Sequence, residues 1–82
     1  MKIVINGIEY KIMKHALVRM EERNISIDKV REVVSYGVKL INKYQRKDGT
    51  GRINNEQYRF MLDGIIVIVE YEPFLRIITV AN

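Results

Sequence analysis

Two short apolar segments flank the dipeptide Asn6-Gly7 near the start of the chain. Lys2 to Ile5 and Ile8 to Ile12 are both rich in β-branched residues, which favour strands. Asn-Gly readily adopts the two positive φ angles of a type I′ turn. The pattern therefore predicts a β-hairpin over residues 2–12.

The hydrophobic spacing then becomes helical, first between about Lys14 and Asn24. Met13, Ala16, Leu17 and Met20 fall on one arc of a helical wheel, which indicates an amphipathic helix closed by Asn24. Ser is a favoured N-cap residue and Gly a favoured left-handed stop. A second helix is therefore expected from Ser26 to Gly37, with its apolar stripe at Ile27, Val30, Val33 and Val34.

Strand patterns fill the rest of the chain. A polar, glycine-containing loop is expected at 46–51, and Asp63-Gly64 predicts a second tight turn. The apolar run Ile65 to Val69 predicts a central strand, and two helices this short cover only one face of a sheet. The result is an α+β fold in the order ββααββββ, with an antiparallel sheet. The expected strands are Val38 to Gln45, Gln57 to Leu62, Ile65 to Tyr71 and Leu75 to Val80.

The 82 residues suit one domain, which we divide into the hairpin (1–12), the helical pair (13–37) and the sheet (38–82). The chain has no cysteine and one histidine. Disulfides, thiolate zinc and a multi-histidine metal site within one chain are thus excluded, and no metal or other cofactor is expected. The first apolar run breaks at Asn6-Gly7, too early for a signal peptide or a membrane span. We therefore expect a cytoplasmic protein with no membrane partner.

The net charge of +4 is unevenly distributed. Eleven of the 14 Lys and Arg residues, but only five of the 10 Asp and Glu residues, precede Asp48. Such an excess suits a phosphate-bearing or acidic protein partner, but basic surfaces also occur on proteins that bind neither.

His15, Arg19 and Arg23 recur every four residues on the first predicted helix. This spacing places them on one edge of that helix, here called the ridge, beside the buried arc. An imidazole exchanges protons near neutral pH, and guanidinium groups bind phosphate in a forked geometry. The ridge therefore suits phosphodiester chemistry. The alternative, which residue physics alone favours, is that the arginines solvate an exposed helix edge and pair with Glu22.

Residues 15–26, HALVRMEERNIS, resemble the His-Ala-x-x-Arg-Met-x-x-Arg-x-Ile signature of domain-of-unknown-function family 4258. That family is similar to the RelE/ParE-like toxins, several of which are metal-independent RNases with a helical pair on an antiparallel sheet. The resemblance covers residues 13 to 81. It implies that His15, Arg19 and Arg23 form a catalytic site, with Thr79 as a further candidate from the last strand.

A second group of cations follows the helices and surrounds Tyr44. These side chains are candidates for contacts to an RNA backbone, although a solvated loop has the same composition. Unlike well-studied RelE-type RNases, the later strands carry no lysine cluster. The candidate RNA-binding residues are Lys39, Lys43, Arg46, Lys47, Arg52 and Arg59.

The leading hypothesis is a RelE-like, toxin-related domain that binds RNA and cleaves it without metal, with an acidic antitoxin-like protein as a second partner. The rival hypothesis is a non-catalytic interaction module that pairs through an exposed sheet face or edge, with itself as a homodimer or with another protein. A third alternative is a relative with the fold but no activity.

Overall fold

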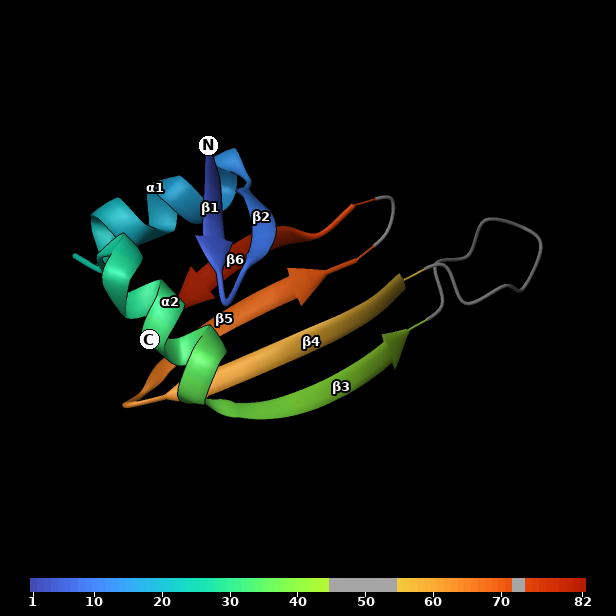
Figure 1. Cartoon of the computed structure of the whole chain (residues 1–82). Coiled ribbons are helices and arrows are strands. Elements are labelled where there is room, and N and C mark those ends of the chain that lie inside the picture. Colours follow the sequence, from blue (N-terminus) through green and yellow to red (C-terminus); the bar gives the residue numbers. More distant parts are fainter. Residues whose placement is uncertain (45–54, 72–73) are drawn as a thin grey trace.

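The computed structural model describes residues 1–44, 55–71 and 74–82 and contains two helices and one sheet (Figure 1). The order ββααββββ confirms the expected α+β fold, and predicted element ends differ by one or two residues. The loop expected at 46–51 lies outside the described residues. The elements are β1 (Lys2–Ile5), β2 (Ile8–Ile12), α1 (Lys14–Glu22), α2 (Ile27–Tyr36), β3 (Val38–Tyr44), β4 (Asn55–Leu62), β5 (Ile65–Glu70) and β6 (Arg76–Ala81).

The six strands form one sheet in the order β1-β2-β6-β5-β4-β3. Each neighbouring pair is antiparallel except β2 and β6, which run parallel with Lys11 opposite Arg76. The expected antiparallel sheet is therefore confirmed except at this one pair. Between β2 and β6 the chain crosses over through both helices and three strands, so that β6 returns in the direction of β2 and enters the sheet beside it.

Both predicted tight turns are confirmed. Asn6 and Gly7 have φ angles of 52° and 79°, and Asp63 and Gly64 have 52° and 76°. Two successive positive φ angles are the requirement of a type I′ turn, which matches the twist of the strands it joins. These turns fix the register of the β1–β2 and β4–β5 hairpins.

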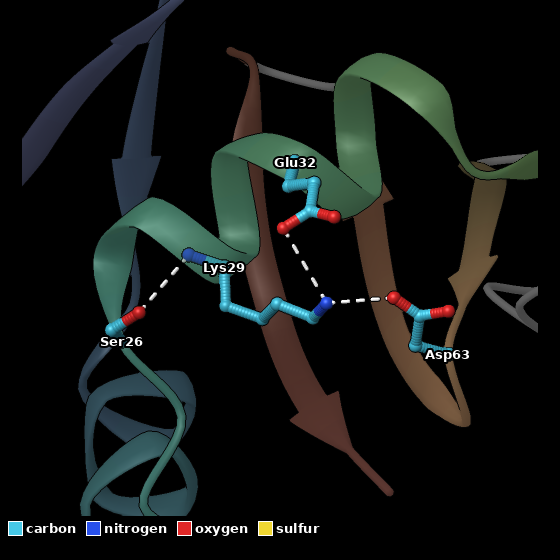
Figure 2. A network of polar contacts seen from close by, with 4 residues as sticks. All are labelled: Ser26, Lys29, Glu32 and Asp63. Carbon is cyan, nitrogen blue, oxygen red and sulfur yellow. Dashed lines mark hydrogen bonds and ion pairs between the residues drawn. The ribbon is translucent and has the colours of Figure 1, made fainter.

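The predicted helix boundaries are confirmed at Asn24 and Ser26. Asn24 has a φ of 54°, the left-handed conformation that ends a helix. The Ser26 hydroxyl accepts a hydrogen bond from the Lys29 backbone N–H at 3.1 Å, which is the expected N-cap. Figure 2 shows this cap at the start of α2.

Gly37 ends the second helix as expected, but the expected left-handed conformation was wrong. Its φ of −71° and ψ of 163° are extended rather than left-handed. Glycine is needed here for space, because a Cβ atom would lie 2.4 Å from the Val33 carbonyl oxygen and 2.8 Å from that of Met61. Because the end of α2 approaches β4 so closely, a residue without a side chain is required at this position.

Lys29 connects α2 to the β4–β5 turn (Figure 2). Its Nζ atom lies 2.8 Å from Asp63 Oδ2 and 3.4 Å from Glu32 Oε2. The hydrogen bond to Asp63 raises the pKa of Lys29 above its ordinary value. Asp63 thus serves both the turn conformation and the contact with the helix.

The core lies between the sheet and the two helices. α1 packs against β6, and α2 packs against β4, β5 and β1. The first hairpin turns across the sheet toward α2 (Figure 1), where Asn6 Nδ2 donates to Ser35 Oγ and Arg31 Nε donates to the Val4 carbonyl. The fully buried core side chains include Ala16, Val30, Val33, Val67, Val69 and Val80.

The opposite side of the sheet, here called the outer face, has no helix packed on it among the described residues. Ile66 and Ile68 of β5 point there and are half-buried, whereas Val67 and Val69 on the helix face are fully buried. Val38 and Leu40 of the edge strand β3 share the outer face and are 63% and 45% exposed. The described helices therefore cover one face only, as the pattern predicts.

No helix in the described ranges has the length and apolar character needed to cross a membrane.

Candidate functional site

The ridge lies on the surface of α1, and helix packing determines its orientation. Ala16 and Met20 are buried in the core, which fixes the rotation of α1 about its axis. His15 in the first turn and Arg23 at the C-cap are exposed, and the Arg19 side chain is 41% exposed. The side chains expected to form a site are therefore accessible from one side of one helix.

Few internal contacts engage the ridge. Arg19 Nη1 lies 3.7 Å from Glu22 Oε2, and Arg23 Nη1 donates to Asn82 Oδ1 at 3.3 Å. An exposed ion pair such as Arg19–Glu22 contributes little free energy, and the Arg23 contact is a single exposed hydrogen bond. His15 makes no side-chain hydrogen bond or ion pair with the described part of the chain. The ridge cations are therefore available to a ligand.

Thr79 belongs to the outer face rather than to the ridge. In the register of the sheet, Thr79 faces Ile68, and Ile68 faces Arg59. Neighbouring strands lie about 4.8 Å apart, so the Cα atoms of Arg59 and Thr79 are about 10 Å apart. The structure thus aligns two candidate residues, one proposed for catalysis and one for RNA binding, in a single row.

Arg59 is placed in an apolar environment between Leu40 and Ile68. Its Nε atom is buried and has no hydrogen-bond partner in the described ranges, although the residue as a whole is only half-buried. A buried donor without a partner costs free energy. Arg59 therefore carries a local energetic cost in the fold.

Of the other RNA-binding candidates, Lys39 is the one with a described side chain, and it does not join Arg59. Lys39 lies on the helix side of the sheet, with its Nζ atom 4.3 Å from the Tyr58 ring centre and 5.9 Å from that of Phe60. These cation–π contacts give it a packing role. Lys43 belongs to β3, but its side chain is not among the described ones. Arg46, Lys47 and Arg52 lie outside the described residues.

Sequence reasoning missed a buried polar cluster on the outer face. Glu70 is 2% exposed and accepts hydrogen bonds from Arg76 Nη2 at 2.5 Å and Gln57 Nε2 at 3.0 Å. The register places these three residues side by side on β6, β5 and β4. One signal was present in the sequence, because Glu70 directly follows the apolar run of the central strand.

A cavity of about 300 Å³ has no ridge residue in its lining. It lies beside the first hairpin and is lined by Lys2, Glu9, Lys11, Phe74 and Leu75. Among the described residues, no group of three or more His, Cys, Asp or Glu side chains is arranged to hold a metal ion.

The fold and the helical motif define a small α+β domain with a cationic helix edge. The model of the domain of unknown function DUF4258 matches residues 12–81. The chain belongs to this family, and the first strand and most of the second precede the matched segment. No curated protein and no solved structure matches the chain.

Proposed function

We propose that this protein is a RelE/ParE-like domain that binds RNA and cleaves it without a metal ion. The observation that carries the proposal is the joint exposure of His15, Arg19 and Arg23 on one edge of α1. An imidazole beside two guanidinium groups supplies both proton transfer and phosphate binding. The uneven basic charge of the chain supports an anionic partner.

The proposed reaction is attack of a ribose 2′-hydroxyl on the adjacent phosphorus. His15 accepts the hydroxyl proton as the new P–O bond forms, and the P–O bond to the 5′-oxygen of the next nucleotide breaks. The leaving 5′-oxygen takes up a proton, giving a 2′,3′-cyclic phosphate and a free 5′-hydroxyl. Arg19 and Arg23 hold the phosphate and offset the charge that grows on its oxygens.

Binding and cleavage are tested separately with a labelled single-stranded RNA. In fluorescence anisotropy, Arg19→Gln and Arg23→Gln are expected to weaken binding, and each is expected to reduce the salt slope by about 0.7, the value for one phosphate contact. Lys14→Gln is the matched control, because Lys14 is an exposed cation of α1 on the side away from the ridge. Equal affinities for all three variants and the wild type would refute binding by the ridge.

Cleavage is followed in bacteria that express the wild type or His15→Ala, with growth and RNA integrity as readouts. The wild type is expected to slow growth and fragment RNA, whereas His15→Ala is expected to be harmless and to retain RNA affinity in vitro. If both proteins are equally harmless, the nuclease proposal fails. An acidic protein that co-purifies with the chain and restores growth would support the antitoxin partner.

The second candidate function is a non-catalytic interaction module. Its supporting observation is the exposure of Val38 and Leu40 on the outer face of the edge strand β3. Exposed apolar side chains on an unpaired edge favour association with another strand. Light scattering decides this alternative: a dimer that Leu40→Lys converts to a monomer supports it, and a monomeric wild type refutes self-association.

A further inference from the structure

Three cations face one another across β1, β2 and β6 on the outer face. Lys2 lies opposite Lys11 in the first hairpin, and Lys11 lies opposite Arg76 in the parallel pair. Like charges at directly opposed positions destabilise a sheet. This row therefore carries an electrostatic cost in the protein alone, which a bound anion would relieve.

The carboxylates near this row pair with some of its cations and not with others. Arg76 is paired with the buried Glu70, and Lys2 lies 3.5 Å from Glu9, with both side chains more than 60% exposed. The exposed pair is weak and is screened by salt. Lys11 has no carboxylate partner in the described part of the chain. The ion pairs of the described residues therefore involve Lys2 and Arg76 but not Lys11.

An aromatic side chain lies beside these cations. Lys11 Nζ is 5.3 Å and Arg76 Cζ is 5.8 Å from the centre of the Phe74 ring, and Arg76 Nη1 donates to the Phe74 carbonyl at 3.4 Å. These contacts hold Phe74 in place, although the residue remains 46% exposed. A fixed, half-exposed ring next to cations is an arrangement that binds flat anionic molecules.

The cavity of about 300 Å³ on the outer side of the hairpin is lined by two of these residues, Lys11 and Phe74, and by Lys2, Glu9 and Leu75. Phe74 and Leu75 give it apolar walls, and Lys2 and Lys11 give it a cationic rim. This volume is at the lower end of the range for small-molecule sites. The cavity therefore has room for one small ligand with an apolar part and a negative part.

We propose that this cavity binds one nucleotide unit of single-stranded RNA, with the base against Phe74 and Leu75 and the phosphate at Lys2 and Lys11. A nucleotide combines the two required features, because every base has a flat π-face and every linkage carries a negative charge. Single-stranded RNA as the source of the nucleotide rests on the proposed function, whereas nucleotide binding itself does not.

The cavity and the ridge are close along the chain. His15 follows Lys11 by four residues, so their Cα atoms are at most about 14 Å apart. The Met13 N–H donates to the Ile77 carbonyl at 3.0 Å, which ties this connection to β6. The cavity lies on the outer face and α1 on the helix face, so an RNA strand that engages both would pass around the edge of the sheet formed by the first hairpin.

Nucleotide binding is tested by backbone amide NMR of the whole protein, titrated in parallel with adenosine 5′-monophosphate, adenosine and inorganic phosphate. We expect the monophosphate to shift amides around the cavity and to bind at least about fivefold more tightly than either other probe. Phe74→Leu is expected to weaken binding of the monophosphate about fivefold or more, which is the loss typical of one base stack. Tyr36→Leu is the matched control, because Tyr36 is an 80% exposed aromatic residue on α2.

Three results would overturn the proposal. Equal binding of the monophosphate and inorganic phosphate would reduce the cavity to a simple anion site, and equal binding of the monophosphate and adenosine would remove the role of the lysines. Shifts confined to the ridge, or none at all, would exclude the cavity. Arg19→Gln distinguishes the two proposals: it is expected to weaken RNA binding and to leave monophosphate binding unchanged.

Discussion

Replacing Arg76 by Met is expected to destabilise the fold strongly, because the substitution removes the cation beside a buried carboxylate. The Glu70 side chain is 3% exposed and that of Arg76 is 13% exposed. Met retains much of the aliphatic volume of arginine but provides no charge and no N–H donor. The perturbation therefore acts mainly on the ion pair.

The expected magnitude follows from the burial. Breaking a buried ion pair by removing one partner typically costs about 3–5 kcal/mol, because the remaining charge is left without compensation. A domain of 82 residues has a total stability of roughly 4–12 kcal/mol. The hydrogen bond from Gln57 remains in the variant, so we expect a loss near 3 kcal/mol and a fall in Tm of more than about 10 °C.

Urea unfolding followed by circular dichroism measures this loss. In the double variant Glu70→Gln and Arg76→Met, no charge is buried, so stability should recover by about 2 kcal/mol relative to Arg76→Met alone. Lys2→Met breaks an exposed pair on the same face and should change stability by less than about 1 kcal/mol. The reasoning is refuted if Arg76→Met is as mild as Lys2→Met, or if the double variant shows no recovery.

Three further predictions concern packing, capping and pH. Gly37→Ala should cost about 1–3 kcal/mol, because the new methyl group meets backbone carbonyls of α2 and β4; an unchanged urea midpoint would contradict this. Ser26→Ala should lower stability by about 1 kcal/mol through loss of the N-cap. Ser26→Asp should retain most of the stability of the wild type, because aspartate also caps helices. Burial, followed by repulsion from Tyr71, raises the pKa of Tyr10 above 10.0. The unfolded chain therefore releases this proton first, and stability should fall as pH rises above about 10. Tyr10→Phe should make that fall shallower in urea titrations at pH 8 to 11.

Local features of the fold could be predicted from the sequence because neighbouring residues determine them. The turn at Asn6-Gly7 and the helix boundaries at Asn24 and Ser26 depend on backbone preferences and short-range hydrogen bonds. Gly37 was misread because its role depends on how closely α2 approaches β4, which involves residues distant in sequence. The parallel pairing of β2 with β6 was missed for the same reason, since strand propensity does not determine strand order.

The candidate site shows the same division. The ridge could be predicted because the i, i+4 spacing on one helix needs no knowledge of tertiary structure. Lys39 and Arg59 could not be assigned to faces, because the β3–β4 register places Lys39 opposite Phe60 and Arg59 opposite Leu40. One residue of slippage would exchange the two faces. The contact between Glu70 and Arg76 likewise depends on the β5–β6 register, which is shifted by an irregularity near Ile68.

The position of β6 between β2 and β5 has a consequence for biosynthesis. During translation the first hairpin emerges early, but the strand that joins it to the rest of the sheet is made only when residues 76–81 appear. The meander from β3 to β5 and the packing of α2 on β4 and β5 can form before then, whereas α1 packs against β6 and closing the long intervening segment is slow. The β2 edge of the nascent hairpin therefore stays unpaired until β6 has been synthesised. During this time the edge can pair with other chains.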